Sequence, residues 1–191
     1  SVYHAATLAK GDAAVALLGD PGSGKSLLAA CLLDMGFRLL DDDVLAIRLD
    51  GGAPMAQPGV QALKLRPNAL AIIRDRIPLL VLHEALGEKT WLALPPHPAD
   101  AAAPLKHLVF LSPAEDSGAS GQSADCVAAP AMAAARMLSE RWYGFLYPGM
   151  CDAETARNDS FRQSANLAKA TRSYRLNCGI GFVGLRRAAE R

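Results

Sequence analysis

One segment constrains the fold of this chain more than any other: residues 19–26 have the sequence Gly-Asp-Pro-Gly-Ser-Gly-Lys-Ser. The segment fits the phosphate-binding loop pattern G-x-x-x-x-G-K-[ST] at every constrained position. An apolar run at residues 13–18 predicts a buried strand before it, and the apolar spacing of residues 25–35 predicts a helix after it. A true phosphate loop lies between a strand and a helix, so this order favours nucleotide binding over a Gly-rich turn before an ordinary helix.

Each part of the predicted loop has a chemical task. The glycines let the backbone curl so that several N–H groups point inward, and the helix start adds roughly half a positive charge. We expect Lys25 to contact the β- and γ-phosphates and the Ser26 hydroxyl to hold Mg²⁺. The predicted nucleotide-binding residues are Gly19, Asp20, Pro21, Gly22, Ser23, Gly24, Lys25 and Ser26.

Composition limits the classes of partner. The 191 residues are 51% hydrophobic, which suffices for one sizeable core, so we expect a single domain over residues 1–191. A net charge of +1 gives no drive toward nucleic acid or a membrane surface. Arginines are denser from Arg136 onward, in a pattern typical of a solvated helix face, with substrate docking as the alternative. The sequence begins at Ser1 rather than Met, which leaves room for a preceding segment.

Cysteine usage and hydropathy indicate a cytoplasmic protein. No apolar run reaches the length that spans a membrane, and no secretory signal is visible, so we expect no membrane association. The cysteines lack the spacing of a metal site or a disulfide framework, which fits a reducing compartment. They are Cys31, Cys126, Cys151 and Cys178.

The order of predicted elements indicates an α/β fold with a mixed sheet and flanking helices. A hairpin at the start of the chain favours a mixed sheet over a purely parallel one. Residues 53–67 are interrupted by Pro and Gly and are expected to be irregular, and residues 112–129 are expected to form a surface loop. Strands are expected at residues 2–8, 13–18, 38–40, 44–49, 90–94, 106–111 and 173–176, and helices at residues 25–35, 68–75, 131–146, 152–170 and 184–190.

A second polar constellation follows the strand predicted at residues 38–40. Asp41, Asp42 and Asp43 come directly after it, and we expect that strand and the strand entering the phosphate loop to end at the same sheet edge. Phosphoryl transfer needs a carboxylate to accept a proton and a metal to neutralise charge. Side chains of an extended segment alternate, so Asp41 should face away from Asp42. The alternative is a solvated turn, in which Asp clusters are common.

His4 is a third candidate. It lies on the strand predicted to pair with the one that enters the phosphate loop, among small apolar residues. A lone His in such a strand is more often packed than catalytic, so both interpretations stay open on its position alone.

Together these residues resemble a known family. His4-Ala5, the loop at residues 19–26 and the segment Gly-Phe-Arg-Leu-Leu-Asp-Asp-Asp-Val at residues 36–44 resemble the catalytic domain of HPr kinase/phosphorylase. They resemble more closely still the HPr-kinase-like serine kinases associated with lasso-peptide biosynthesis. The motif-bearing resemblance covers roughly the first 50 residues, with a weaker similarity at residues 58–67 and 173–176.

The resemblance implies a fold related to PEP carboxykinase and an ATP- and Mg²⁺-dependent kinase. The acceptor would be a serine hydroxyl on a peptide or small protein, such as a lasso-peptide precursor. By the same resemblance, Asp42 is the base that deprotonates the serine, Asp43 helps to place Mg²⁺ or orient the base, and His4 lies near the transferred phosphate. The family tends to form rings, so a homo-oligomer is an open expectation.

Departures from the family pattern bear on the acceptor. The Arg-Gly-x-Gly signature of HPr kinase is missing, and no Asp or Glu occurs between Gly51 and Arg74, which weakens HPr as the acceptor. The segment Lys-Leu-Arg-Pro at residues 64–67 resembles the lasso-type kinases instead. Lys64 and Arg66 are therefore candidates for contact with substrate phosphate or the acceptor backbone, and Lys89 is a weaker one. A solvated basic strand is the alternative.

Three other functions remain compatible with the sequence. The chain could be a bifunctional HPr kinase/phosphorylase, an enzyme that phosphorylates a small metabolite hydroxyl, or a nucleotide-dependent switch that binds a partner. A switch usually has a water-positioning residue and recognisable mobile segments, and the sequence offers no clear version of either.

Overall fold

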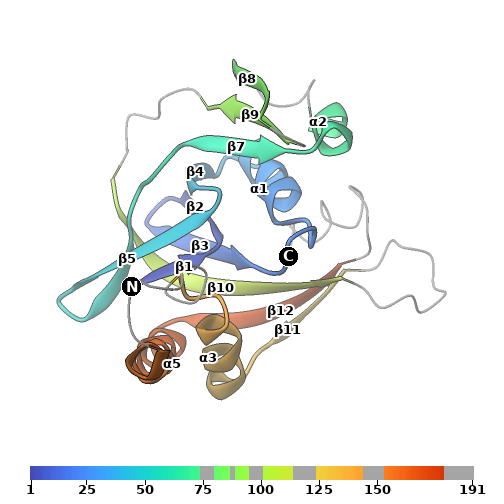
Figure 1. Cartoon of the computed structure of the whole chain (residues 1–191). Helices are drawn as coiled ribbons and strands as arrows, with labels where there is room; N and C mark the ends of the chain where they lie inside the picture. The colour runs from blue at the N-terminus through green and yellow to red at the C-terminus, as the bar shows by residue number, and fades with distance from the viewer. Residues whose placement is uncertain (74–79, 87–88, 95–100, 114–123, 144–152, 179–191) are drawn as a thin grey trace.

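A strongly curled mixed sheet forms the centre of the structure, a computed structural model that describes residues 1–73, 80–86, 89–94, 101–113, 124–143 and 153–178 (Figure 1). Its strands are β1 (Val2–His4), β2 (Ala6–Lys10), β3 (Ala13–Leu18), β4 (Arg38–Asp41), β5 (Val44–Asp50), β6 (Ala53–Ala56), β10 (Ala103–Pro113), β11 (Ala124–Ala128) and β12 (Arg172–Cys178). The order is β1-β5-β6-β10-β3-β2-β4, and β12 also pairs with β10 and with β11. The long strand β10 runs parallel to β3 and β12, so it ties the parts of the sheet together.

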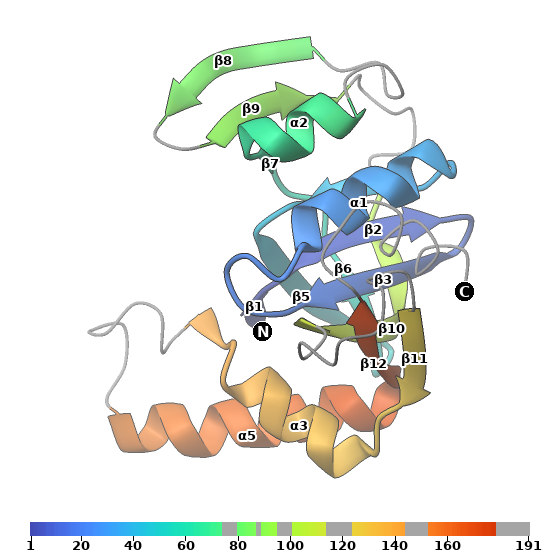
Figure 2. The same cartoon turned by 90° about the vertical axis from the view of Figure 1, so that its right-hand side faces the viewer.

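Helices and a smaller sheet cover the two faces of this curled sheet (Figure 2). On one side lies α1 (Lys25–Asp34), followed outward by α2 (Pro67–Ile73) and the antiparallel strands β7 (Ala62–Leu65), β9 (Lys89–Ala93) and β8 (Leu80–Leu86). On the other side lie α3 (Ala131–Ser139) and α5 (Ala153–Ala170), packed against each other. None of the helices among the described residues has both the length and the apolar character needed to cross a membrane.

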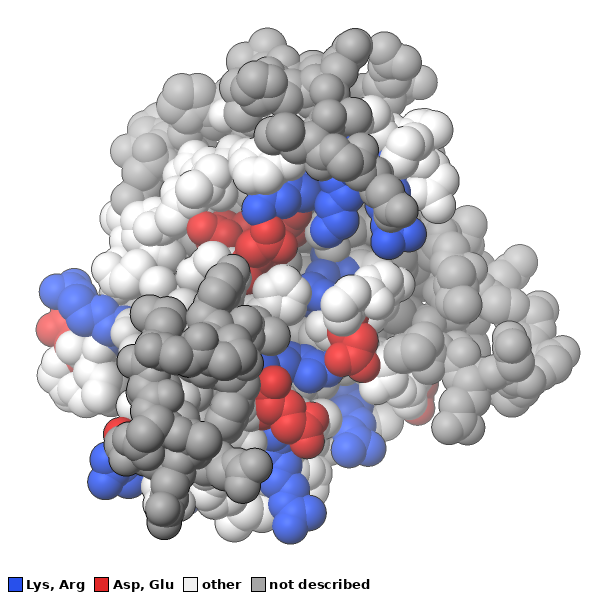
Figure 3. Space-filling model, in the orientation of Figure 1, with Lys and Arg blue, Asp and Glu red and all other residues white. Residues whose placement is uncertain are grey.

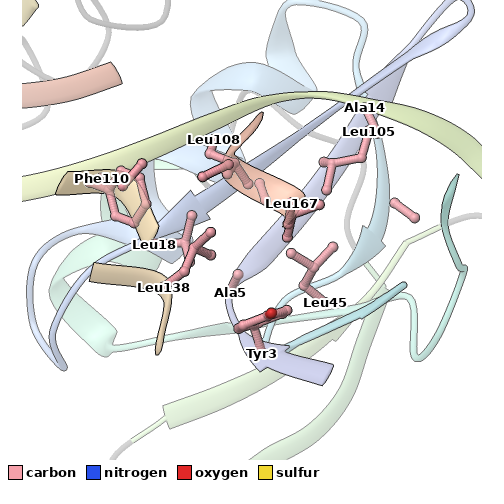
Figure 4. Close-up of a cluster of buried hydrophobic side chains, with 14 of the residues drawn as sticks. Tyr3, Ala5, Ala14, Leu18, Leu45, Leu105, Leu108, Phe110, Leu138 and Leu167 are labelled. Atoms are coloured by element: carbon pink, nitrogen blue, oxygen red, sulfur yellow. The ribbon is translucent and has the colours of Figure 1, made fainter. Parts of the chain in front are cut away.

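Two apolar clusters hold these layers together. One joins α1 to β2, β3, β7 and α2 through buried residues such as Leu28, Leu63 and Ile73. The other joins the opposite face of the sheet to α3 and α5, and includes Leu108 and Leu138 (Figure 4). Because both faces of β3 are covered, its residues are apolar almost throughout, as the sequence requires of a buried strand.

The sheet bends at one corner. Two neighbouring chain segments, one running from β1 into β2 and the other from β4 into β5, change direction there side by side. β1 pairs antiparallel with β5, and β2 pairs antiparallel with β4. Ala5 lies between β1 and β2, and Asp42 and Asp43 lie between β4 and β5. The Ala5 N–H donates to the Asp43 carbonyl at 3.1 Å, which keeps the two chains paired through the bend. The corner therefore carries the aspartates singled out in the sequence.

Asp41 stabilises this corner through its carboxylate. One oxygen accepts hydrogen bonds from the N–H groups of Asp43 and Val44, each at 2.8 Å. The other accepts from the Val60 N–H at 2.9 Å, which fixes the connection between β6 and β7. A short Asp side chain that bonds the backbone two and three residues onward is typical of a tight turn. Asp41 is therefore a structural residue that faces away from Asp42, as the alternation predicts.

The fold class predicted from the sequence is confirmed: the structure is α/β, with a mixed sheet and flanking helices. The hairpin of β2 and β3 is present, and α1, α2, α3 and α5 begin within a residue of their predicted starts. Cys31 is buried within α1. The helix predicted at residues 184–190 lies outside the described residues, and the extent of the domain over residues 1–191 stays a prediction.

Several predicted boundaries are wrong for identifiable reasons. The strand expected at residues 2–8 is interrupted at Ala5 by the corner of the sheet. The segment 53–67 contains β6 and β7, whose short apolar alternation was masked by neighbouring prolines and glycine. β8 was not predicted, and β11 occupies the end of the expected surface loop. The helix expected at residues 131–146 ends at Ser139.

We predict that Asp41→Ala lowers the free energy of unfolding by on the order of 3 kcal/mol. The substitution leaves three backbone N–H groups without their charged acceptor, and each such loss costs about 1 kcal/mol or more. Urea denaturation measures the change. Asp41→Asn keeps one acceptor oxygen, so its free energy of unfolding should lie between those of Asp41→Ala and the wild type.

Asp50→Ala is the matched control, because Asp50 is exposed at the end of β5 and should change stability by less than about 0.5 kcal/mol. Equal stability of Asp41→Ala and Asp50→Ala would contradict the role given to Asp41.

Candidate functional site

The predicted phosphate loop connects β3 to α1, as its sequence requires. Gly24 precedes the helix with a φ of 94°, and Gly22 has a φ of 86°, a left-handed conformation that side-chain-bearing residues rarely adopt. Gly19 packs under the end of β10, where an added Cβ would lie 2.5 Å from the Ser23 hydroxyl oxygen and 3.1 Å from the Leu111 carbonyl. The loop glycines are therefore required by backbone conformation and by close packing.

Lys25 lies inside the curl of this loop. Its Nζ donates to the Gly19 carbonyl at 2.8 Å and to the Asp20 carbonyl at 3.1 Å, and the residue is 8% exposed. Burial lowers the pKa of Lys25, and the nearby charge of Arg141 lowers it further. A buried ammonium group whose hydrogen bonds in the described part of the chain go to neutral carbonyls can still bind an anion strongly.

Asp42 lies at the same end of the sheet as the phosphate loop, as predicted, although the two strands that lead there are not adjacent. β3 and β4 are not neighbours, because β2 lies between them. Both strands are antiparallel to β2, so they run parallel to each other and their carboxyl ends meet at one edge. The Asp42 carboxyl therefore lies close enough to Ser26 and Lys25 to interact with both.

The Asp42 carboxyl is almost entirely buried, at 2% exposure, and only half satisfied. Its Oδ2 accepts the Lys64 N–H at 2.8 Å, whereas its Oδ1 is buried without a partner. Burial raises the pKa of Asp42 to about 7, and the charge of Asp43 adds to this effect. The Lys64 N–H and the Ser26 hydroxyl partly offset it. A carboxyl with a pKa near neutrality can both take and release a proton at physiological pH.

Asp43 has the opposite electrostatic environment. Its Oδ2 forms an ion pair with the Lys64 ammonium group, which also lies 4.3 Å from the centre of the Trp91 ring. Burial works to raise the pKa of Asp43, but the Lys64 hydrogen bond and charge outweigh it and the pKa is lowered. Two adjacent carboxyl groups thus have pKa values shifted apart, an arrangement typical of sites that separate a proton acceptor from a charge-stabilising group.

His4 and Tyr143 meet at the Asp43 backbone. His4 Nδ1 lies 3.1 Å from the Asp43 carbonyl and the Tyr143 hydroxyl donates to the same oxygen at 3.3 Å. Since a carbonyl oxygen only accepts, the Nδ1 of a neutral His4 carries the proton and Nε2 is its basic nitrogen. Burial lowers the pKa of His4, and the charge of Lys25 lowers it further. His4 therefore lies beside the aspartates and is neutral at pH 7, but the strand pairing predicted for it is wrong: β1 pairs with β5, and the strand that pairs with β3 is β2.

Arg141 is a site residue that sequence reasoning missed. It follows α3, and its Nη2 donates to the Asp20 carboxylate of the phosphate loop at 3.0 Å. Its backbone is held by β1, because the His4 N–H donates to the Arg141 carbonyl at 2.9 Å. The sequence placed it within a solvated helix, and a separation of 121 residues from Asp20 leaves no local signal for this contact.

Two of the other three basic candidates, Lys64 and Lys89, interact with the aspartates. Lys64 is engaged with both Asp42 and Asp43, through its backbone and its side chain respectively. Lys89 is exposed on β9, and its charge reaches Lys25 and both carboxyl groups. Arg66 is exposed just before α2, and a role in acceptor binding stays a prediction. Figure 3 shows acidic and basic side chains gathered near the centre of one face of the molecule.

The residues of this corner fit a nucleotide with a divalent cation. Three of the six buried side-chain atoms without a hydrogen-bond partner in the described part of the chain are Asp42 Oδ1, Ser23 Oγ and Arg141 Nε. Buried polar atoms normally have partners, so their concentration here indicates a ligand site. Ser26, Asp42 and Asp43 offer the hard oxygen ligands that Mg²⁺ prefers. No group of three or more His, Cys, Asp or Glu side chains forms a metal cage among the residues described, so nucleotide phosphates would have to complete the coordination.

Comparisons with known proteins give one distant neighbour of interest. No protein-family model matches the chain, and no curated protein matches it. Among solved structures, the chain is similar to the Hpr(Ser) kinase/phosphatase from Coxiella burnetii, with a TM-score of 0.38 and 14% sequence identity. The matched region covers 58% of this chain and 64% of that one, slightly less than two thirds of the neighbour's length. A likeness this distant assigns no activity, so function has to be argued from the site.

The raised pKa of Asp42 predicts how stability depends on pH. The folded state holds this proton up to about pH 7, whereas the unfolded chain releases it near 3.8. The contribution of Asp42 to the free energy of unfolding of the wild type is therefore highest below pH 4, where this side chain is protonated in both states. It falls as the pH rises to about 7, because only the unfolded chain ionises freely in that range. Asp42→Asn cannot ionise, so its stability relative to wild type should increase between pH 4 and pH 8 by on the order of 2–4 kcal/mol, at about 1.4 kcal/mol per pKa unit.

Urea denaturation at several pH values, with a chelator present to remove metal, measures this difference. The pH-dependent part is insensitive to any constant effect of the amide group, and Asp50→Asn serves as the exposed control. A difference between Asp42→Asn and wild type that stays flat above pH 5 would show that Asp42 ionises normally.

Proposed function

We propose that this protein is an ATP- and Mg²⁺-dependent kinase that transfers the γ-phosphate to a serine hydroxyl on a peptide or small protein. The observation that carries the proposal is the buried Asp42 carboxyl, which has a pKa of about 7 and lies within interaction range of Ser26 and Lys25. Nucleotide binding alone needs the loop and Lys25, but it does not need a carboxyl that can accept a proton beside them. Phosphoryl transfer to a hydroxyl needs such a carboxyl, because the hydroxyl loses its proton.

In this mechanism each side chain has one task. The serine Oγ attacks the γ-phosphorus, the Oγ–P bond forms as the bond to the β–γ bridging oxygen breaks, and the serine proton passes to Asp42. Lys25 binds the phosphates and stabilises the charge that develops on them. Ser26 and Asp43 would hold Mg²⁺, which neutralises phosphate charge when bound. His4, neutral and fixed through Nδ1, packs against the Asp43 turn and helps to hold it in place.

The Lys64–Asp43 ion pair bears on how metal enters. The ammonium group occupies one oxygen of the Asp43 carboxylate, so Lys64 would compete with a bound Mg²⁺ for this side chain. The Trp91 ring, whose centre already lies 4.3 Å from the Lys64 ammonium group, would remain as a contact for this group if Asp43 released it. Lys64 is then available to approach the phosphate or the acceptor, in keeping with its predicted role in substrate binding.

The acceptor is assigned by sequence resemblance. The segment at residues 64–67 and the missing Arg-Gly-x-Gly signature favour a lasso-peptide precursor over HPr. Purified protein should be incubated with ATP and Mg²⁺ together with a precursor peptide ending in serine or with HPr. Phosphoryl transfer to the peptide supports the proposed acceptor. Transfer to HPr, and reversal with inorganic phosphate, would instead support the bifunctional kinase/phosphorylase.

We predict that Lys25→Ala and Asp42→Asn each lower kcat/KM for phosphoryl transfer by at least ~10²–10³, about 3–4 kcal/mol of transition-state stabilisation. The two variants should differ in which step fails. Lys25→Ala should weaken ATP binding, whereas Asp42→Asn should bind ATP normally and lose kcat. Steady-state kinetics with direct measurement of ATP affinity separates them.

Acceptor-independent hydrolysis distinguishes the kinase from a nucleotide-dependent switch. The proposal predicts slow ATP hydrolysis without acceptor and fast transfer with it. Fast hydrolysis without acceptor, together with wild-type turnover in Asp42→Asn, would remove the base from the mechanism and favour the switch.

A further inference from the structure

Arg141 has the features of a phosphate ligand, and the Asp20 carboxylate occupies the position that a phosphate would take. Its side chain is 18% exposed, and its Nε is buried without a hydrogen-bond partner. The Asp20 carboxylate with which it pairs is 79% exposed. Ion pairs with such an exposed partner contribute little to stability, so this pair does not explain why a guanidinium group is buried here.

The position of Arg141 identifies the part of the nucleotide it would meet. Lys25 Nζ lies on the carbonyls of Gly19 and Asp20, and this ammonium group reaches the β- and γ-phosphates in phosphate loops. Arg141 bonds the Asp20 carboxylate of the same loop, its carbonyl accepts the His4 N–H, and its charge lowers the pKa of both Lys25 and His4. Arg141 therefore lies at the terminal-phosphate end of the loop, on the side of His4.

The backbone at Arg141 is fixed by hydrogen bonds to two other segments, whereas its side chain is held by an ion pair with an exposed carboxylate. The Arg141 N–H donates to Leu138 at 2.9 Å, its carbonyl accepts from His4, and the next residue, Trp142, forms a bridge with Tyr3. A guanidinium group on a fixed backbone, paired with a solvated carboxylate, can exchange partners without a change in fold. A phosphate offers it a bidentate acceptor of greater charge than Asp20.

We propose that Arg141 binds the terminal phosphate of the nucleotide, leaving Asp20 when a triphosphate enters and returning to it in the free protein. This inference rests on the proposed nucleotide site and adds to it a residue that distinguishes triphosphate from diphosphate. Two cations, Lys25 and Arg141, would then flank the phosphate that is transferred. Asp20 would keep the guanidinium group directed at the loop while no nucleotide is bound.

The test compares the affinity of a non-hydrolysable ATP analogue with that of ADP, by calorimetry, in the wild type and in Arg141→Ala. The analogue should bind at least 10-fold more weakly to the variant, and ADP less than 3-fold more weakly. Arg141→Lys keeps the charge but loses the planar fork, so it should show an intermediate loss. Arg162→Ala is the matched control, because Arg162 is an exposed arginine on α5 paired with Asp159, and its affinities should equal those of the wild type.

The outcomes separate this inference from the proposed function. If the wild type binds ATP but Arg141→Ala weakens the affinity for both ligands equally, or for neither, the role of Arg141 is overturned. The kinase proposal is then left standing. Selective loss of the triphosphate analogue in a protein that transfers no phosphate to any acceptor would support Arg141 and overturn the kinase. A wild type that binds neither ligand would overturn both.

Discussion

The burial of the Asp42 carboxyl at the corner of the curled sheet is the constraint on which the functional account depends. Ionising a buried carboxyl is costly, and here a single backbone N–H, from Lys64, is its main compensation. Asp41 fixes the turn that points Asp42 inward, and the β7 strand supplies the N–H. The small sheet beside α1 is therefore part of the site, because without it Asp42 Oδ2 would lack its partner.

The three consecutive aspartates have different environments in this geometry. Asp41 bonds only backbone N–H groups and stabilises the turn. Asp42 is buried with a raised pKa, and Asp43 is paired with Lys64 and has a lowered pKa. A carboxylate that stabilises the turn, a buried carboxyl with a raised pKa and an ion-paired carboxylate with a lowered pKa thus occupy adjacent positions, and they differ because each side chain has different neighbours.

Local sequence was sufficient to predict the parts of the site formed by neighbouring residues. The loop at residues 19–26, the helix after it and the opposite orientation of Asp41 and Asp42 follow from spacing and alternation alone. Contacts between distant segments were not predictable in this way. Arg141 is a single residue after a helix, and its role depends on a bridge between Trp142 and Tyr3 that leaves no mark in the local pattern. β6 and β7 were missed because Pro54, Pro58 and Gly59 interrupt the alternation that identifies strands.

Titration of the Asp42 side chain shows whether this carboxyl exchanges a proton at neutral pH. Carbon-detected NMR of protein labelled at the Asp side-chain carboxyl carbons, with Asp42→Asn used to assign the resonance, follows that titration in the metal-free protein. The account predicts a midpoint near pH 7 for Asp42 and one below 3.8 for Asp43. A midpoint near 4 for Asp42 would mean that the carboxyl is solvated, and the base assignment would have to be abandoned.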